Sequence, residues 1–384
     1  MPSDVLVVGA GIVGAACAYS LAAAGLSVVV VDRAAVAAGT TGSGEGNVLV
    51  SDKAPGPELD LQLRSTELWR RYAHELARGS FELEAKGGLT VSSTPEQQEA
   101  LSGLGRGQAG AGVDVRPVSP GDLADLEPHL VPDLSGGAFY PQDLQVQPMR
   151  AAAQLLAAAR QRGATLQLAT EVLGATRAGS RLTGVVTTQG RMSAGWVVNA
   201  AGTWAQGLSE SLGAPVPVLP RRGLILVTEP LPPIIRHKVY SADYVANVAS
   251  SSASLQTSTV IEGTLSGPVL IGSSRERVGY DRSLSVPVLR QMAREATRLF
   301  PVLARVHAIR AYAGFRPYSP DHLPVIGLDP RVEGLVHACG HEGAGIGLAP
   351  ATGLLIRQIV TGGSADLDLA PYRLDRPSLT GSRG

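Results

Sequence analysis

Residues 4–33 read DVLVVGAGIVGAACAYSLAAAGLSVVVVDR, and the organisation of the rest of the chain can be worked out from this stretch. The apolar run Val5–Val8 predicts a buried parallel strand, and the glycine turn Gly9–Gly14 follows it directly. A helix of small residues comes next, and a second strand over Ser27–Val31 ends at Asp32, 18 residues after the third glycine. This order of strand, glycine turn, helix, strand and acid is the dinucleotide-binding fingerprint in the context that it requires.

Each glycine of the turn has a separate physical role in that fingerprint. Gly9 permits the tight turn, Gly11 lets the backbone approach a pyrophosphate, and Gly14 allows close packing of the helix on the strand. The N-terminus of the helix faces the phosphates, and Asp32 can accept hydrogen bonds from a ribose diol. We therefore expect a bound dinucleotide at this end of the chain.

The same stretch is apolar for about the thickness of a membrane, so a signal peptide or a membrane span is the alternative reading. No basic segment precedes it, four glycines interrupt it, and it lies between Asp4 and Asp32. These features favour the dinucleotide site, and no membrane span is expected. Because no export signal is recognised, the protein is expected to be cytoplasmic.

The bulk composition narrows the class of protein further. A chain of 384 residues is long enough for two domains. The formal net charge is zero, which argues against nucleic acid or an anionic membrane as the main partner. The two cysteines, Cys17 and Cys339, form no C-x-x-C pair, so no disulfide framework, zinc site or iron–sulfur cluster is expected.

Two further glycine loops are expected at the nucleotide end of the same fold. The loop over Ala38–Asn47 offers many backbone N–H groups, and a flexible linker is its alternative reading. The segment Trp196–Gly202 predicts another buried strand, whose carboxyl end is the usual place for a ligand. The loop Cys339–Gly345 joins a strand over Gly334–Ala338 to a helix over Ile346–Thr361, whose N-terminus is expected to point at the ligand.

The pattern predicts an α/β fold, in which a Rossmann-like domain carries an inserted α+β domain with an antiparallel sheet. Residues 1–79, 141–216 and 305–384 are assigned to the dinucleotide domain, and residues 80–140 and 217–304 to a substrate-binding domain. Residues 80–140 are expected to form short strands joined by loops rich in Gly, Ser and Pro. Helices are expected over Glu58–Glu75, Met149–Arg162 and Pro287–Leu299.

Four stretches together resemble one family, the flavoprotein amine and D-amino acid oxidoreductases of the glycine oxidase and sarcosine oxidase type. They are the N-terminal fingerprint, GTTGSGEGNVL (39–49), VVNAAGTWA (197–205), and GFRPYSPDHLPVIG (314–327) with the later GHEGAGIGLAPATG (340–353). Their order and spacing cover nearly the whole chain. Two more stretches are similar to the hydroxyproline dehydrogenase, opine oxidase and hydrogen cyanide synthase branch, namely RRGLILVTEP (221–230) and VLIGSSRE (269–276).

This resemblance implies bound FAD rather than NAD. Ile12 and Val13 match residues under the pyrophosphate, and Val172 matches the residue whose backbone contacts adenine. Asp32 and Arg33 match the adenosine ribose site, where the family usually has Glu, so the shorter Asp implies a longer or water-bridged contact. The residues expected to bind FAD are Gly9, Gly11, Ile12, Val13, Gly14, Asp32, Arg33, Gly39, Thr40, Thr41, Gly44, Glu45, Gly46, Asn47, Val172, Ala201, Gly202, Trp204, Gly340, His341, Glu342, Gly343, Ala344, Gly345, Ile346 and Gly347.

Arg316 matches the arginine that clamps the substrate carboxylate in this family, and a planar guanidinium can hold a carboxylate through two hydrogen bonds. The alternative for Arg316 is a structural ion pair with an acid such as Asp321. Where glycine oxidase has a second arginine, this chain has Gly343, which opens space for a bulkier or cyclic amine. Tyr244 is expected to bind substrate. His341 is a candidate catalytic residue beside Arg316, although in this family it more often positions the flavin through its backbone.

Three further points concern the flavin attachment, the side chain of Glu45 and a possible general base. The monomeric sarcosine oxidases attach flavin to a cysteine that this chain lacks between Gly314 and Asp321, so FAD is expected to be noncovalent. The carboxylate of Glu45 is awkward near a pyrophosphate, and we expect its side chain to turn toward a basic residue or solvent. His337 is a further acid/base candidate, although flavin-dependent amine oxidation does not require a dedicated general base.

The expected activity is FAD-dependent oxidation of a small amino acid or secondary amine by hydride transfer from the α-carbon to flavin N5. Glycine, sarcosine, D-amino acids and D-proline or D-hydroxyproline are the substrates considered, and oxygen or an electron-carrier protein is the acceptor. The alternative is a flavin subunit of a larger dehydrogenase that passes electrons to partner proteins, and homo- and hetero-oligomers both stay open. An NAD(P)-dependent dehydrogenase is a third reading, supported by Arg33 beside Asp32 alone.

Overall fold

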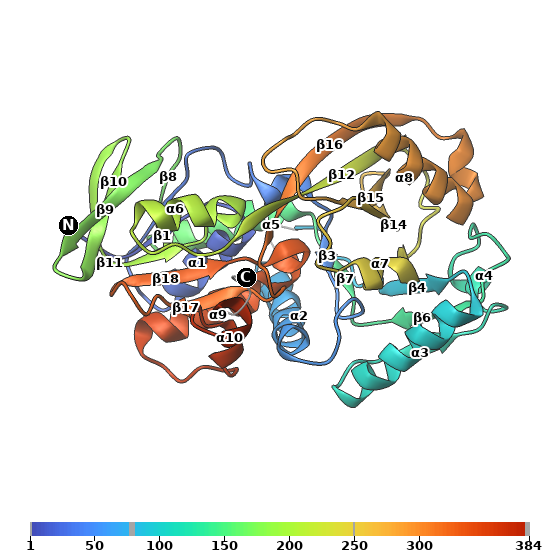
Figure 1. Cartoon of the computed structure of the whole chain (residues 1–384), viewed down its shortest axis with the longest axis horizontal. Helices are drawn as coiled ribbons and strands as arrows, with labels where there is room; N and C mark the ends of the chain where they lie inside the picture. The colour runs from blue at the N-terminus through green and yellow to red at the C-terminus, as the bar shows by residue number, and fades with distance from the viewer. Residues whose placement is uncertain (1, 77–80, 249, 381–384) are drawn as a thin grey trace.

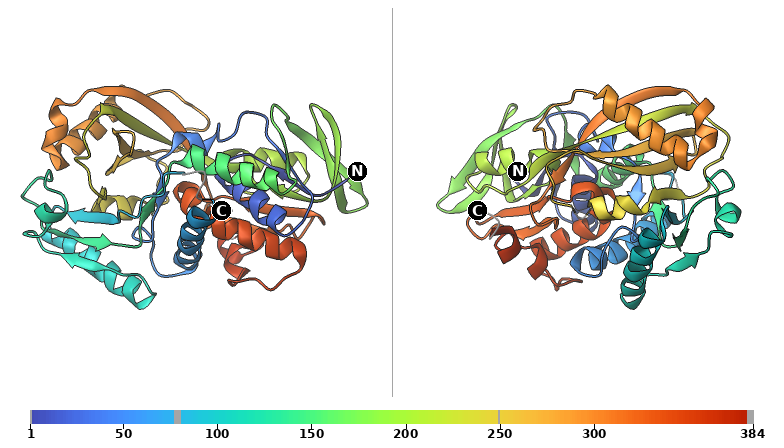
Figure 2. Two further views of the ribbon diagram at one scale, coloured as in Figure 1. Left: turned by 180° about the vertical axis from the view of Figure 1, so that it is seen from behind. Right: turned by 45° about the vertical axis from the view of Figure 1, so that its right-hand side comes forward.

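The computed structural model describes residues 2–76, 81–248 and 250–380 of the chain. Two eight-stranded sheets form two lobes, which lie side by side in Figure 1 and in both views of Figure 2. Short strands β3 (Asn47–Val48) and β7 (Leu144–Gln145) form a separate two-stranded sheet. The expected mixed α/β fold with two sheet-based units is confirmed.

The first sheet is parallel at its centre, with β1 between β2 and β11. Val5 pairs with Val28 on one side and with Trp196 on the other, so all three strands end at the same edge. A hairpin adds β10 and β9 to β11. The strands of the main path, in spatial order, are β17 (Val325–Leu328), β18 (Leu335–Cys339), β11 (Gly190–Asn199), β1 (Ser3–Val8), β2 (Val28–Val31) and β8 (Thr165–Gln167), with β10 (Arg181–Thr187) and β9 (Val172–Ala178) beside β11.

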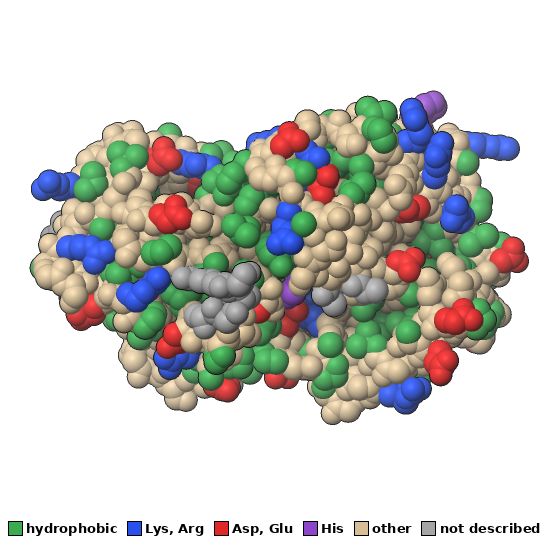
Figure 3. Space-filling model, viewed as in Figure 1, with side chains coloured by type: hydrophobic (Ala, Val, Ile, Leu, Met, Phe, Trp, Pro, Cys, Tyr) green, Lys and Arg blue, Asp and Glu red, His purple; other side chains and the backbone are tan. Residues whose placement is uncertain are grey.

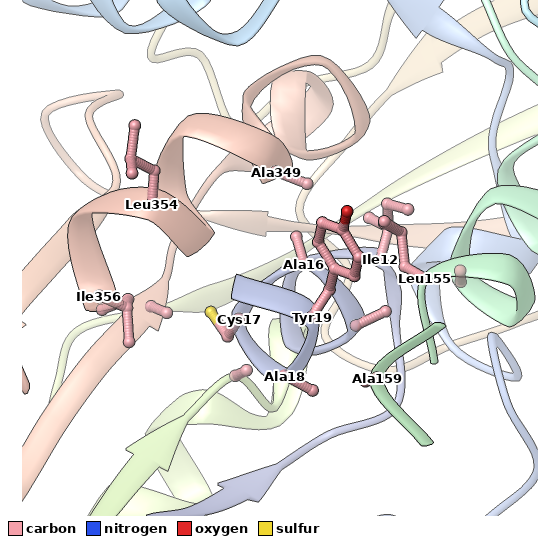
Figure 4. Packing of buried hydrophobic residues seen from close by; sticks show 14 of the residues in the cluster. Ile12, Ala16, Cys17, Ala18, Tyr19, Leu155, Ala159, Ala349, Leu354 and Ile356 are labelled. Carbon is pink, nitrogen blue, oxygen red and sulfur yellow. The ribbon is translucent and has the colours of Figure 1, made fainter. Parts of the chain in front are cut away.

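Helix α1 (Ile12–Ala23) is buried by helix α9 (Gly345–Thr361) and helix α5 (Pro148–Gln161), and α9 also packs on helix α2 (Pro57–Glu75). Figure 4 shows small side chains of α1 lying between those of α5 and α9. A Cβ added at Gly353 of α9 would overlap the carbonyl oxygen of Ala16, so only small residues permit this approach. The close packing explains the small-residue composition of both helices.

The stretch Glu342–Thr361 is long and apolar enough, among the described residues, to cross a membrane by length and composition. Its most apolar window is 67% buried inside the protein, as expected of a core helix. On the face drawn in Figure 3, acidic and basic side chains are interspersed over the described surface, which is consistent with a formal net charge of zero.

The second sheet is antiparallel except where β13 runs parallel to β4. Helix α8 (Val286–Leu299) packs on it through Val288, Met292 and Ala296, which belong to its buried apolar cluster. Its strands, in spatial order, are β16 (Ala308–Tyr318), β12 (Leu219–Pro230), β15 (Pro268–Arg275), β14 (Gln256–Gly263), β13 (Lys238–Ser241), β4 (Gly88–Ser92), β6 (Gly136–Tyr140) and β5 (Arg116–Val118).

Strand β16 corrects one expected domain boundary. Residues 305–384 were assigned to the dinucleotide domain, but residues 308–318 pair with β12 from Leu219↔Tyr318 to Thr228↔Ala308. The assignment of these residues was wrong because a chain segment joins a sheet through its pairing partner, which lies about ninety positions earlier in the sequence. The boundary expected between residues 79 and 80 lies outside the described residues.

Residues 80–140 also contain a helix that was not expected, α3 (Pro95–Gly110). Thr94 caps it by accepting a hydrogen bond from the Gln97 N–H at 3.3 Å, and Pro95 occupies its first turn. Four glycines in sixteen residues lower its helix propensity and resemble a loop. Packing on β4 and β6 stabilises it instead. Helix α4 (Leu123–Leu126) is a further short turn, and α6 (Ala205–Ser211), α7 (Ala242–Val248) and α10 (Pro377–Thr380) complete the helices described.

Asp329 holds the β17–β18 hairpin together, and this gives a testable prediction about stability. Its buried carboxylate accepts hydrogen bonds from His337 Nε2 at 3.0 Å and from Arg331 Nη2 at 2.6 Å. Burial alone would raise the pKa of Asp329, but these hydrogen bonds outweigh it and hold the pKa well below its usual range. The resulting stabilisation is present above about pH 4 and is lost as the pH falls.

We therefore expect Asp329→Asn to lower the free energy of unfolding at pH 7 by about 2 kcal/mol. The difference from the parent protein should shrink at pH 3.5, because the parent carboxylate begins to be protonated on unfolding. Urea denaturation of both proteins at both pH values measures this. Asp375→Asn is the control, since that carboxylate is exposed and pairs only with the exposed Arg373. An equal loss at both pH values would contradict the prediction.

Candidate functional site

A cavity of about 650 Å³ lies at the carboxyl ends of the parallel strands. Val8, Val31, Ala200 and Cys339, which end or follow β1, β2, β11 and β18, all line it. This is the edge of a parallel sheet at which ligands are expected. The cavity continues to the second sheet, where Ile225 of β12 and Arg316 of β16 line it.

The glycine turn presents the N-terminus of helix α1 to the cavity. Gly9 has a φ of +118°, and a Cβ there would overlap the carbonyl oxygen of Ala200. Gly11 is the N-cap of α1 and makes no side-chain capping hydrogen bond. The Ile12 N–H donates to Thr41 Oγ1 at 3.0 Å, which ties the turn to the second glycine loop. Such an N-terminus favours a negatively charged group.

Asp32 and Arg33 lie where the ribose site was expected, but both are already engaged. The Asp32 carboxylate accepts from the Ala10 N–H at 2.7 Å and from the Ala34 N–H at 2.8 Å. Each oxygen keeps a further lone pair for a diol. The Arg33 guanidinium lies 4.5 Å from the ring centroid of Trp204 and pairs with Glu171 at 3.7 Å. The NAD(P) alternative rested on Arg33 alone. This arrangement does not support it, because the guanidinium is already engaged with Trp204 and Glu171.

The second glycine loop contacts both lobes. It contains the 3₁₀ turn η1 (Thr40–Ser43), and Thr40 Oγ1 donates to the Phe315 carbonyl at 2.7 Å. A Cβ at Gly39 would lie 3.0 Å from the Trp204 ring, and one at Gly46 would overlap the Val146 carbonyl oxygen. The loop is therefore packed in place and is no flexible linker.

Most residues expected to bind the dinucleotide line the cavity, and five do not. Ala344 precedes α9 as its N-cap. Gly14, Gly46, Gly340 and Gly347 instead allow close packing, because a Cβ at each would overlap a neighbouring oxygen atom. The expected residues that do line the cavity are Gly9, Gly11, Ile12, Val13, Asp32, Arg33, Gly39, Thr40, Thr41, Gly44, Glu45, Asn47, Val172, Ala201, Gly202, Trp204, His341, Glu342, Gly343, Gly345 and Ile346, together with Arg316 and Tyr244.

Arg316 has no carboxylate partner among the described residues. Its Nη1 donates to the Ser274 carbonyl at 2.9 Å. Asp321, the acid considered as its structural partner, pairs through both oxygens with Arg376, at 2.6 and 2.8 Å. Burial lowers the pKa of Arg316 to about 10, and the charge of Arg275 adds to this shift, so Arg316 remains a cation at neutral pH. A partly buried cation in a cavity is a site for an anion.

Two other arginines of β12 are already paired. Arg221 donates to Glu342 at 2.5 Å, and Arg222 donates to Glu276 at 2.7 Å and to Asp281 at 2.6 Å. Neither therefore competes with Arg316 for a carboxylate.

Glu45 was expected to turn toward a basic residue or solvent. It does not reach solvent, since it is 6% exposed, but the charges of Lys238 and Arg316 lie near enough to act on its pKa, without an ion pair among the described residues. Its Oε2 accepts from Asn47 at 3.3 Å, and its Oε1 lies against Gly272 of β15 without a hydrogen-bond partner. Burial raises the pKa of Glu45. The side chain thus belongs to the substrate end of the cavity.

The acid/base reading of the two histidines is not supported. His341 is buried, its Nε2 lies 2.9 Å from Thr352 Oγ1, and burial lowers its pKa to about 3. It therefore stays neutral near pH 7 and is a poor proton acceptor. His337 is fully buried in β18 beside Asp329 and does not line the cavity. The imidazole of His341 thus links its loop to α9, and that of His337 stabilises the β17–β18 hairpin.

Several cavity residues were missed in the sequence. Gly223, Ile225, Gly314 and Phe315 come from the paired strands β12 and β16, and Arg282 comes from the loop after β15. The register Gly223↔Gly314 places two glycines opposite each other at the cavity. A G–F–R motif on an eleven-residue strand was the available signal, but its partner strand is not predictable from local pattern.

The residues present fit a dinucleotide. The cavity runs past two helix N-termini without side-chain caps, those of α1 and α9, and past two glycine loops. The chain matches the family model described as FAD dependent oxidoreductase over residues 4–359. The chain belongs to this family of FAD-dependent oxidoreductases.

Relatives and solved structures agree with that membership. The chain is 31% identical to hydrogen cyanide synthase subunit HcnC of Pseudomonas aeruginosa, covering 96% of this chain and 95% of the relative. It is 29% identical to glycine oxidase of Geobacillus kaustophilus over 97% of both chains. The crystal structure of that glycine oxidase superposes with a TM-score of 0.89 at 28% identity, covering 98% of this chain and 99% of that chain. The crystal structure of L-proline dehydrogenase from P. horikoshii superposes with a TM-score of 0.89 at 25% identity, covering 98% of this chain and 97% of that chain.

These findings confirm the expected family, the α/β fold and FAD as the cofactor of an oxidoreductase. The residues expected at the adenosine end of FAD, Asp32 and Val172, line the same cavity as those expected at the flavin end, which lie in the loop η4 (Glu342–Ala344) and at the start of α9.

Proposed function

We propose that this protein oxidises a small amino acid or secondary amine, of the glycine, sarcosine, D-amino acid or D-proline class. Arg316 is the observation that carries the proposal, because it is a cavity cation without a carboxylate partner among the described residues. Its guanidinium matches a carboxylate in shape and charge. Gly343 lies beside it, since a Cβ there would be 3.5 Å from Arg316 Nε, and leaves room for the substrate.

When bound, FAD supplies the two-electron acceptor, because flavin N5 can take a hydride from the α-carbon of the amine. The protein positions the substrate. Arg316 holds its carboxylate, and Tyr244, Ile225 and Phe315 enclose the rest of the substrate. Such positioning reduces the entropic cost of the reaction. Because burial lowers the pKa of His341 to about 3, this imidazole is not the group that would take a proton from the substrate amine.

The proposal predicts that the purified protein is yellow and bleaches anaerobically when an amine of this class is added. Acid precipitation should release the colour, because the expected FAD is noncovalent. We would test glycine, sarcosine, D-alanine and D-proline in turn, with acetate as the control that carries a carboxylate but no amine. Bleaching by none of these amines, in protein saturated with FAD, would contradict the proposal.

A second candidate function is a flavin subunit that passes electrons to partner proteins. The relative at 31% identity is itself called a subunit, which favours this reading. The two functions share the oxidation of the amine and differ in the acceptor. Rapid peroxide formation by the isolated chain would favour an oxidase, whereas turnover with artificial electron acceptors but not with oxygen would favour the subunit.

A further inference from the structure

A second arginine, Arg275 of β15, lies beside the cavity without an anionic partner. It is 3% exposed, and its guanidinium lies 4.7 Å from the ring centroid of Tyr244, which lines the cavity. Its Nη1 is buried without a hydrogen-bond partner, and its guanidinium makes no ion pair with the described residues. A cation–π contact stabilises a guanidinium only partly, by about 1–2 kcal/mol. Leaving a buried charged donor unsatisfied costs more than that.

Other buried cations at this junction are neutralised, and this makes Arg275 and Arg316 distinctive. Lys238 pairs with Glu262, Lys53 with Asp52 at 2.7 Å, and Arg221 with Glu342. At this junction, the fold therefore pairs each of these three structural cations with a carboxylate. The charges of Glu45 and Glu342 act on Arg316, but neither carboxylate forms an ion pair with it. Two buried cations without an ion pair are expected to meet an anion that the chain does not provide.

The two unpaired arginines are close in space. Arg316 donates to the carbonyl of Ser274, the residue before Arg275, and the Arg275 charge depresses the pKa of Arg316. Two like charges in a partly buried site repel each other. A ligand with two negative groups relieves this repulsion more completely than a ligand with one.

Two neighbouring side chains complete the pattern. Tyr244 contacts Arg275 through its ring, and its hydroxyl makes no hydrogen bond to a described residue, so it is free to donate to a ligand in the cavity that Tyr244 lines. The buried Glu45 lines the same cavity with an oxygen that lacks a donor. Arg282 is a further cavity cation, but it is exposed and lies 5.7 Å from the Phe315 ring, away from this cluster. The cluster of Arg316, Arg275, Tyr244 and Glu45 thus offers two cations, one hydroxyl donor and one acceptor.

We propose that the substrate is a dicarboxylic amine, in which two carboxylates flank one amino group. Arg316 binds the carboxylate on the reacting α-carbon. Tyr244, backed by the charge of Arg275, binds the second carboxylate, and Glu45 faces the amine. This inference rests on the proposed amine oxidation and narrows its substrate class.

Binding to the oxidised, FAD-loaded protein tests the two-carboxylate site without turnover. We would titrate malonate, succinate and glutarate against acetate, propionate and butyrate, following the flavin absorbance difference spectrum. The best diacid should bind at least about tenfold tighter than its monoacid counterpart. Equal affinity for all diacids and monoacids would overturn the inference.

Substitutions then assign the second carboxylate to its side chains. Arg275→Gln and the milder Tyr244→Phe should each weaken diacid binding about tenfold and change monoacid binding less than twofold. Arg310→Gln is the matched control, because it removes the same charge from an exposed position on β16. Weakening of both ligand classes by the same factor would show that Arg275 acts structurally, and would overturn its assignment.

Anaerobic flavin reduction separates this inference from the proposed function. D-aspartate should reduce the flavin faster than D-alanine at equal concentration, and N-carboxymethyl-glycine faster than sarcosine. Reduction by the monocarboxylic amines alone would overturn the dicarboxylate inference and leave the proposed function standing. Arg275-dependent diacid binding with no reduction by any amine would support the site and contradict the proposed function.

Discussion

Arg316→Lys should reduce the rate of flavin reduction about a hundredfold and weaken substrate binding, with the flavin spectrum unchanged. Lysine keeps the positive charge but loses the planar fork of two donors, so the carboxylate would be held by one mobile charge. The α-carbon would then be poorly aligned for hydride transfer. Arg316 also donates to the Ser274 carbonyl, and this anchor would be weakened as well.

Single-turnover reduction under anaerobic conditions, at a series of substrate concentrations, separates the rate of the chemical step from affinity. Arg310→Lys is the control on the same strand, because Arg310 is exposed and does not line the cavity. If Arg316→Lys reduced its flavin at the parent rate with unaltered affinity, Arg316 would be structural. The carboxylate would then have to bind at another cation in or beside the cavity, Arg275 or Arg282, since Arg221 and Arg222 are already paired.

Gly9→Ala should remove FAD binding and lower the stability of the protein. The φ of +118° at Gly9 is strained for any residue with a Cβ, and that Cβ would overlap the Ala200 carbonyl oxygen. Overpacking of a tight core typically costs about 1–3 kcal/mol, and the strained backbone adds about 1–2 kcal/mol. The turn would have to shift, which would displace the N–H groups at the start of α1.

Gly25→Ala separates the effect of the strained backbone from the effect of the steric overlap. Gly25 has a φ of +83°, but nothing lies within 4 Å of the position that its Cβ would take. It should cost about 1 kcal/mol and leave FAD affinity unchanged. FAD titration of the apoproteins and urea denaturation measure both effects. A Gly9→Ala protein that binds FAD as tightly as the parent would show that the turn tolerates a side chain.

The local sequence pattern was sufficient to predict a helix or strand where the contacts that determine it lie close together in the sequence. The strand, turn and helix of residues 4–33 are such a case, because the glycine requirements and the apolar runs that form them lie within one contiguous stretch. The structure describes β1 and β2 there within two residues of the expected bounds, and α1 begins at Ile12, within the turn Gly9–Gly14 that was expected to precede it. The same holds for α2, α5, α8 and α9, whose apolar spacing shows directly in the sequence.

Local pattern failed where a distant segment decides the outcome. The glycine-rich α3 is a helix because β4 and β6 pack against it, and β16 joins the second sheet because β12 pairs with it. His341 was a plausible acid/base residue by type, but burial against α9 makes it neutral.

The family, the cofactor and the candidate carboxylate clamp at Arg316 were therefore within reach of the sequence, since each rests on a contiguous motif. The partners of the charged residues were not. Asp321 stands five residues from Arg316 yet pairs with Arg376, while the charges of Arg275 and Glu45 come from distant segments to act on Arg316. Which charges are neutralised and which are left for a substrate depends on distances and burial, because the energy of an ion pair depends on both. Only the tertiary structure sets these.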